Sequence, residues 1–221
     1  MKLLELLRIT EAPNSTVNGF PSLNIAEVYH VGFMDPQHKR RGSLEGSGLS
    51  VSLHPEAWTK IAKLGGRPTQ ALTNPKGTFL NYHALTDEQK KAILSWGEQN
   101  RYVSGATTYR VSWYDDEADG TVFSIMHDRE KAEAEAEDME DSVVKELPGS
   151  YVATPLMQQR VHGSADPSLV LDLLSTIFVE DVLGWDGVWW KDTLDPASLS
   201  APRGVIVPNA ISRWQRSQST G

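Results

Sequence analysis

Three segments of the chain combine polar side chains with glycine in a way that suits a binding or reaction site. The first is an expected strand that ends in His30 and Gly32. The second is a glycine-led strand in which Ser50 and Ser52 point to the same face, because side chains alternate along a strand. The third, 183–192, places aromatic and acidic residues after a glycine. Imidazole and hydroxyl groups exchange hydrogen bonds with a ligand, and glycine lets the backbone approach it closely.

Several other kinds of chemistry are excluded by what the sequence lacks. The chain has no cysteine, so disulfides, thiolate catalysis and zinc–cysteine sites are impossible. It contains no GxxxxGK[ST] phosphate loop, no HExxH helix and no GxSxG elbow, and no GxGxxG follows an expected strand. The six histidines are scattered and do not stand at metal-ligand spacing, so we expect no metal site.

In order, the three segments and the strand that closes the chain read YHVG, GLSVS followed by HPEAW, GWDGV and RGVIVPNAI. This order resembles the ADP-ribosyltransferase superfamily, in particular its small phage and bacterial effector members. The resemblance implies a split sheet with an NAD cleft between its two halves. It also implies transfer of ADP-ribose from NAD to a protein or nucleic-acid acceptor.

The resemblance further implies which residues bind NAD. In it, the imidazole of His30 hydrogen-bonds a ribose hydroxyl, and the ring of Tyr82 stacks on nicotinamide. The full set of expected NAD-binding residues is Tyr29, His30, Gly32, Gly48, Leu49, Ser50, Ser52 and Tyr82.

The expected catalytic residues are His30 and Asp192. Breaking the nicotinamide–ribose bond develops positive charge on the ribose, and a nearby carboxylate stabilises that charge. Asp192 ends a late expected strand, and Asp195 and Asp186 are the alternative carboxylates. The resemblance places a glutamate on a late strand, where this chain has none, and Arg203 stands where related strands carry an acid or glutamine. An inactive relative that acts by binding, or a virion-associated protein, is therefore the alternative function.

Structural explanations for the same residues also remain open. His30 is equally suited to be a hydrogen-bonded structural histidine, and the serines of the second segment to be ordinary strand residues. Asp186 precedes a glycine, a pair typical of turns, which favours a structural role over a catalytic one. Trp189 and Trp190 are adjacent and point to opposite faces of a strand. We therefore predict that at least one of Trp185, Trp189 and Trp190 faces solvent or a ligand.

Charge and hydropathy narrow the possible partners and location. The 221 residues carry a formal net charge of −8, and an acidic surface repels phosphate backbones, so we expect no general DNA or RNA binding. No apolar run approaches the roughly 20 residues of a membrane span, so no membrane partner is expected. The apolar residues at the N-terminus are interrupted by Glu5 and Arg8, unlike a signal peptide. These features favour the cytoplasm of a bacterium or of an infected host cell.

Hydrophobic periodicity predicts a single α+β domain over 1–221, with a split two-sheet architecture and flanking helices. A hairpin and a charged, solvated helix are expected near 106–146, and a flexible polar tail over 212–221. Segments 11–22 and 67–84 are expected to be irregular. The predicted helices are 2–9, 55–64, 86–96, 128–146 and 166–183. Thr86 and Gln89 form the pattern of a capping box at the start of one helix, and Gly184 is suited to cap the C-terminal end of the last. The predicted strands expected in two facing sheets are 26–31, 49–53, 106–114, 121–126, 187–190 and 204–207, and 151–154 is a further candidate strand.

Overall fold

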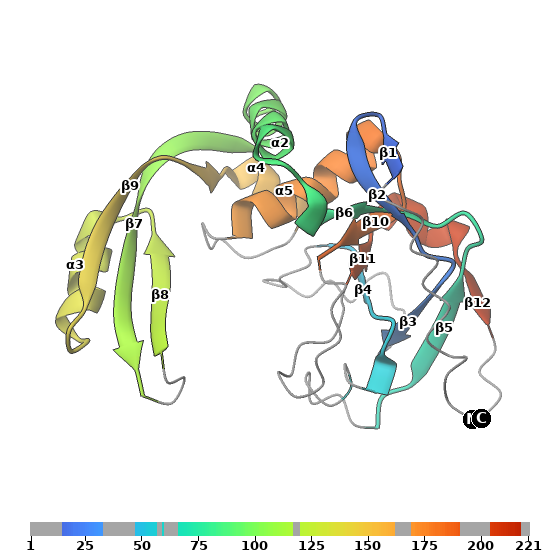
Figure 1. Ribbon diagram of the computed structural model, residues 1–221, viewed down its shortest axis with the longest axis horizontal. Coiled ribbons are helices and arrows are strands. Elements are labelled where there is room, and N and C mark those ends of the chain that lie inside the picture. The colour runs from blue at the N-terminus through green and yellow to red at the C-terminus, as the bar shows by residue number, and fades with distance from the viewer. Residues whose placement is uncertain are drawn as a thin grey trace.

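The computed structural model of the chain is an α+β protein, as the sequence predicts (Figure 1). It describes the following residues: 15–32, 47–56, 59, 66–116, 120–161, 169–190 and 204–217. Within these ranges the strands form three sheets rather than the expected two. The predicted helix 2–9 lies outside the described residues, as does most of the predicted helix 55–64.

The largest sheet has the order β1-β2-β6-β10-β11-β4, and we call it sheet A. Its members are β1 Ser15–Val17, β2 Phe20–Asn24, β6 Thr78–Asn81, β10 Gly187–Trp189, β11 Gly204–Ile206 and β4 Leu49–Val51. Strands β6 and β10 are parallel, and the other neighbours are antiparallel. Sheet B has the order β12-β5-β3 and is antiparallel. Its members are β12 Gln215–Ser217, β5 Thr69–Thr73 and β3 Glu27–Val31.

Aromatic rings join sheet A to sheet B and form part of the core. Phe79 of β6 meets Trp189 of β10 and also Trp214, which directly precedes β12, each at 5.8 Å between ring centroids. Val28 of β3 and Leu72 of β5 are completely buried in the same core. Complete burial of side chains of this size stabilises the fold by about 2 kcal/mol each, before the cost in conformational entropy.

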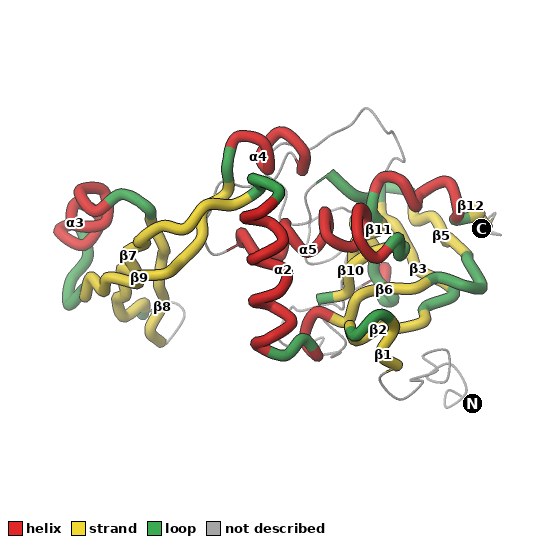
Figure 2. Tube along the Cα trace, turned by 90° about the horizontal axis from the view of Figure 1, so that it is seen from above, coloured by secondary structure: helices red, strands yellow, loops and turns green. Residues whose placement is uncertain are grey.

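Helices cover the edge of this core where β6 and β10 end (Figure 2). The predicted helix 86–96 is confirmed as α2, Asp87–Gln99, and it begins with the expected capping box between Thr86 and Gln89. Helix α5, Val170–Phe178, is almost entirely buried and continues as a π-helical turn to Leu183. Gly184 ends that turn at a φ of 65°, which confirms its predicted role as a C-terminal cap. The short helix α4, Pro155–Val161, was not predicted.

The third sheet forms an arm that projects from the two other sheets (Figures 1 and 2). It has the order β8-β7-β9, with helix α3 packed on one face. The members of the arm are β7 Val103–Asp115, β8 Gly120–Met126, α3 Arg129–Glu137 and β9 Val143–Ala153. The pairing of β7 with β9 shifts register between Ala106 and Thr108, opposite Pro148 and Gly149. Proline offers no N–H to the ladder and Gly149 has a φ of 72°, so the ribbon bends there.

The arm corrects two expectations. The hairpin near 106–126 is confirmed, but it belongs to this separate sheet and not to one of two facing sheets. The predicted helix 128–146 is too long, because the chain leaves the helix after Glu137 and returns along β7 as β9. Val143 and Val144 are β-branched, and pairing with Ser112 and Val111 favours the strand.

Elsewhere the strands predicted at 26–31, 49–53, 187–190 and 204–207 are confirmed within two residues. Segments expected to be irregular contain β1, β2, β5 and β6. Residues 212–217, expected in a flexible tail, instead complete a 3-10 helix, bury Trp214 and pair with β5. In the part of the chain that is described, no helix is both long enough and apolar enough to cross a membrane.

Candidate functional site

Sheets A and B meet where β3 and β4 run side by side. Tyr29 of β3 and Ser52, which follows β4, form an antiparallel bridge. Their backbones exchange two hydrogen bonds, from Tyr29 N–H to Ser52 O at 2.8 Å and from Ser52 N–H to Tyr29 O at 2.9 Å. Within the described ranges, this is the one isolated backbone bridge between β3 and β4. The first two motif segments of the sequence therefore lie together at the division between the sheets.

His30 joins these two segments through its side chain. Its Nδ1 lies 2.8 Å from the backbone oxygen of Ser50. A carbonyl oxygen only accepts hydrogen bonds, so the Nδ1 atom carries the hydrogen and donates. In the neutral imidazole the Nε2 atom is then the acceptor, which is the group needed to accept a hydrogen bond from a ligand hydroxyl.

Gly32 follows His30 and has a φ of 138°, a backbone conformation that strongly favours glycine. Its N–H donates to Pro68 O at 2.9 Å, and its carbonyl accepts from the Gln70 side chain at 3.0 Å. A Cβ atom added to Gly32 would lie 3.3 Å from His30 Nε2. A side chain at this position would therefore crowd the acceptor atom of the imidazole.

The two serines of the second segment have different environments. Ser52 is completely buried, and its Oγ accepts a hydrogen bond from the backbone N–H of His54 at 2.9 Å. Ser50 is half-buried and presents its carbonyl to His30. The hydroxyl of Tyr29 donates to the carboxylate of Glu27. Of the two serine hydroxyls, Ser50 is therefore the one that retains exposed surface at the junction.

Gly48 and Leu49 have packing roles in the structure. A Cβ on Gly48 would overlap the side chain of Val205 and approach the Ile206 carbonyl to 2.6 Å. Close approach to β11 thus accounts for glycine at this position without a ligand. Leu49 packs against the hydrophobic core.

Tyr82 lies on sheet A, away from β4, the strand whose Ser50 is bonded to His30. It follows β6, which is three strands from β4, or about 14 Å at the usual strand spacing. Its hydroxyl donates to Asp172 on α5 at 3.1 Å. Burial, together with the nearby Asp172 carboxylate, raises the pKa of the Tyr82 phenol above its usual range.

Tyr82 and Ser52 nevertheless lie at the same end of sheet A, where β6 and β4 both finish. Strands β6, β10 and β4 run in the same direction, and Asn81 aligns with Trp189 and Gly204 with Val51. The residues that directly follow these strands, Tyr82, Trp190 and Ser52, therefore lie at the same end of the sheet, beyond the carboxyl ends of the three strands. The ring centroids of Tyr82 and Trp190 are 6.4 Å apart.

All three tryptophans of the third segment are buried, at 7% exposure or less, so of the two expected alternatives, solvent or a ligand, solvent is wrong for each of them. Trp189 and Trp190 do point to opposite faces of β10, but both faces of this central strand are covered. Phe79 packs on Trp189, and Tyr82 lies next to Trp190. The indole N–H of Trp190 is buried and makes no hydrogen bond within the described ranges.

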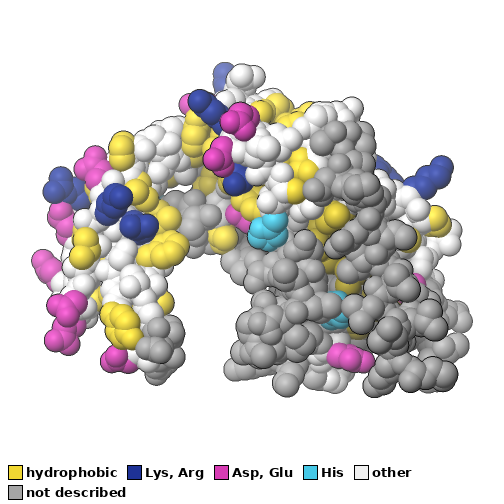
Figure 3. Space-filling model, viewed as in Figure 1, with side chains coloured by type: hydrophobic (Ala, Val, Ile, Leu, Met, Phe, Trp, Pro, Cys, Tyr) yellow, Lys and Arg dark blue, Asp and Glu magenta, His cyan; other side chains and the backbone are white. Residues whose placement is uncertain are grey.

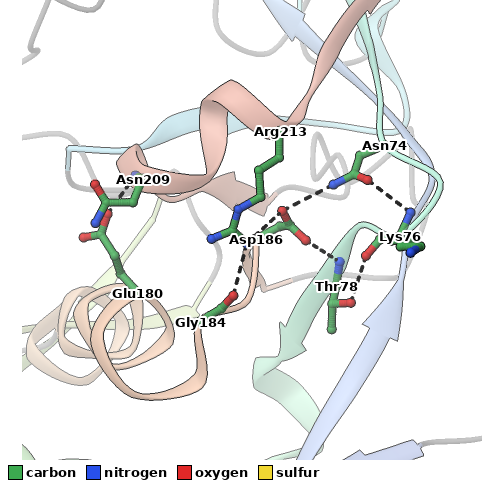
Figure 4. Close-up of polar contacts among 8 residues, drawn as sticks. All are labelled: Asn74, Lys76, Thr78, Glu180, Gly184, Asp186, Asn209 and Arg213. Carbon is green, nitrogen blue, oxygen red and sulfur yellow. Dashed lines mark hydrogen bonds and ion pairs between the residues drawn. The ribbon is translucent and has the colours of Figure 1, made fainter.

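Asp186 has the structural role that its turn position favours (Figure 4). Its carboxylate accepts from Thr78 N–H at 2.9 Å and from the Asn74 side chain at 3.4 Å, and it lies 3.6 Å from Arg213. It is 4% exposed. These contacts fix the start of β10 against β6. Asp192, Asp195 and Arg203 lie outside the described residues.

His54 is a residue that the sequence did not single out. It lies two residues after Ser52 at the sheet junction, and its Nε2 is buried with no hydrogen-bond partner in the described part of the chain. Burial lowers the pKa of His54, and the nearby Glu56 opposes that effect. No sequence pattern distinguishes such a histidine from an exposed one.

The lowered pKa of His54 predicts a loss of stability in acid. Below its usual pKa of about 6.5 the unfolded chain binds a proton that the folded chain resists, so stability falls as pH falls. We expect the melting temperature of the His54→Gln protein to fall less than that of the parent protein between pH 7.5 and pH 5. Glu56→Gln removes the charge that raises the pKa of His54, so the melting temperature of this variant should fall more than that of the parent. Equal acid sensitivity of all three proteins would contradict this assignment.

The described residues contain no cluster of three or more histidine, aspartate and glutamate side chains that could hold a metal ion. Comparison with protein-family models, with curated proteins and with solved structures finds no match to this chain.

Proposed function

We propose that the chain binds NAD where β3 meets β4 and transfers its ADP-ribose to an acceptor. The observation that supports this most directly is the hydrogen bond from His30 Nδ1 to the Ser50 carbonyl at the division between the two sheets. That bond orients the imidazole and assigns its tautomer, so Nε2 is the atom presented to a ribose hydroxyl. A side chain at Gly32 would crowd that atom. The arrangement agrees with the split-sheet NAD cleft that the sequence resemblance implies.

The proposed reaction breaks the bond between C1′ of the ribose and the nicotinamide nitrogen. The bonding electron pair leaves with nicotinamide, whose ring nitrogen loses its positive charge, and the ribose develops the positive charge. A nucleophilic atom of the acceptor then bonds to C1′ and loses its proton. His30 holds the ribose, and Asp192 is the proposed carboxylate that stabilises the developing cation. Trp190, two residues before Asp192 in the sequence, directly follows β10 at the end of sheet A where Ser52 also lies.

Tyr82 has a narrower role in this proposal than the sequence suggests. Its distance of three strands from β4 separates it from a nicotinamide held beside His30. Its hydroxyl is already bonded to Asp172, and its ring lies next to Trp190. We therefore assign Tyr82 to the wall of the proposed NAD cleft, and we propose that the nicotinamide lies closer to β3 and β4.

The direct test is the effect of NAD on thermal stability. A ligand that binds only the folded state at 100 times its Kd stabilises it by about 2.7 kcal/mol, or roughly 5–10 °C in Tm for a chain of this size. We expect such a rise with NAD and a smaller one with ATP at equal concentration. No rise at millimolar NAD would refute the proposal. A rise without nicotinamide release on prolonged incubation would instead support the non-catalytic, binding alternative.

A further inference from the structure

The arm has one face that α3 leaves uncovered, and we call it the open face. The side chain of Ser124 on β8 bonds to Glu135 of α3 at 2.9 Å, so Ser124 and its partner Val111 belong to the helix-covered face. Neighbouring residues on each strand point the opposite way. The open face therefore includes Arg110, Ser112 and Tyr114 of β7, Phe123 of β8, and Val143 and Lys145 of β9.

Large apolar side chains on the open face are exposed to solvent. Phe123 is 58% exposed, Tyr114 55% and Val143 62%. Phe123 and Val143 both pair with Ser112, which lies between them on the central strand. The small side chain of Ser112 therefore lies between two larger apolar side chains on the open face. Exposed apolar surface arranged in this way is typical of an interaction site.

The open face is basic, whereas the rest of the arm is acidic. Arg110 and Lys145 pair directly across β7 and β9, and the six named residues of the face include no carboxylate. The guanidinium of Arg110 lies 5.9 Å from the ring centre of Phe123, and its Nε is buried with no hydrogen bond inside the described ranges. Figure 3 shows hydrophobic and basic side chains together on the arm, with acidic ones along its outer edge. This separation of charge favours an anionic occupant.

A pocket of about 330 Å³ lies where the open face reaches α2 and α5. Its lining includes Leu94 of α2, Leu171 of α5, and Thr108, Ile125 and Leu147 of the arm. In the alternation of side chains along the strands, the last three point to the same side as Arg110 and Lys145, so the pocket lies on the open face. The volume is at the lower end of the range for ligand pockets and suits one large apolar side chain.

We propose that the open face binds an acidic segment of another protein, extended along β7, with one apolar side chain inserted in the pocket. The seven residues from Thr108 to Tyr114 span about 23 Å, the length of an extended segment of similar size. Carboxylates of the segment pair with Arg110 and Lys145, and its apolar side chains cover Phe123 and Val143. Arginine and aromatic residues surrounded by apolar surface are typical of protein interfaces.

A single-stranded nucleic acid is the competing anionic occupant, because exposed rings and cations also bind bases and phosphates. Two observations favour protein. Val143, Ile125 and Leu147 are aliphatic and offer no ring on which a base stacks. The net charge of −8 also opposes a polyanion as long as a nucleic acid, whereas a short acidic segment meets only the local positive charge of the open face.

Binding at the open face does not depend on the proposed NAD chemistry. Identification of the bound protein as the acceptor does rest on that proposed function. In that case, the arm selects a protein acceptor with an acidic segment. The two ideas are measured separately, because NAD binding is read from the Tm in the absence of any partner.

The test is selection of phage-displayed random 12-residue peptides on the full-length protein, with fluorescence anisotropy of the enriched peptides as the quantitative measurement. We expect enriched sequences to combine aspartate or glutamate with a large apolar residue. Phe123→Ser and Lys145→Glu should each weaken binding at least tenfold. Lys131→Glu, a matched charge reversal on the helix-covered side of the arm, should leave the affinity within twofold. Unchanged melting temperatures would show that all three variants fold.

Three outcomes would overturn the proposal. The first is enrichment no greater than that on the Lys145→Glu protein, and the second is enrichment of basic peptides. The third is tighter binding of a 12-nucleotide oligo(dT) than of any selected peptide, with the same sensitivity to Phe123→Ser, which would assign the surface to nucleic acid. Because none of these measurements contains NAD, each outcome leaves the NAD proposal to its own test.

Discussion

Replacing Gly187 with alanine is expected to lower the Tm by about 10 °C or to prevent folding altogether. A Cβ atom at this position would overlap the carbonyl oxygen of Val205 and lie 2.7 Å from a ring carbon of Phe79. Neither group can move easily, because β10 is a central strand of sheet A and Phe79 is completely buried. Overpacking of this kind costs about 3 kcal/mol or more, a large part of the stability of an ordinary domain.

Gly105→Ala is the matched control for this substitution. Gly105 also lies in a strand, β7, but the nearest atom to its added Cβ is the Glu98 carboxylate oxygen at 3.9 Å, an ordinary contact. We expect its Tm to equal that of the parent protein or to rise slightly, since alanine has less freedom in the unfolded chain. Equal thermal unfolding of the Gly187→Ala and Gly105→Ala proteins would contradict the close packing of β10 against β11.

The Asp186-Gly187 pair shows which features the sequence predicts and which it does not. The pair Asp186-Gly187 was interpreted as a turn, and Asp186 does hold a structural corner through Thr78 and Arg213. The glycine, however, is required because β11 and Phe79 leave no space for a side chain. That requirement comes from segments far apart along the chain, so no local pattern could predict it.

Elements with a strong local pattern were predicted from the sequence, whereas elements held by distant partners were not. The capping box at Thr86 and Gln89 located the start of α2, and alternation located β7 and β8. Strands β5 and β6 were missed because their short sequences lie among glycine, proline and asparagine. Their strand conformation depends on partners 38 or more residues away, β3 for β5 and β2 for β6.

The candidate site shows the same division between local and distant information. The sequence predicted that His30 and the serine strand lie side by side, and the bond from His30 to Ser50 agrees with that expectation. It could not predict that Ser52 is buried and accepts a hydrogen bond from the backbone N–H of His54, or that Tyr82 lies three strands from β4. Strand order in a sheet is determined by pairing between distant segments, and motif order along the chain does not specify it.

His30→Asn is expected to reduce nicotinamide release from NAD by roughly a hundredfold while the Tm remains within about 2 °C. The asparagine side-chain nitrogen is as many bonds from Cβ as Nδ1 is, so it can still donate to the Ser50 carbonyl. It has no counterpart of Nε2, so the proposed ribose contact is lost. Loss of correct substrate positioning commonly costs about this factor in rate.

His30→Gln supplies the complementary measurement. Its side-chain amide reaches the position of Nε2 and loses the bond to Ser50, so we expect a lower Tm together with partial retention of NAD binding. A purely structural histidine predicts the opposite pattern, in which Asn preserves every property and Gln damages only the fold. Activity that survives His30→Asn in full would therefore remove His30 from the reaction. The Asn and Gln variants distinguish the two ring nitrogens, one bonded to the protein and the other assigned to NAD.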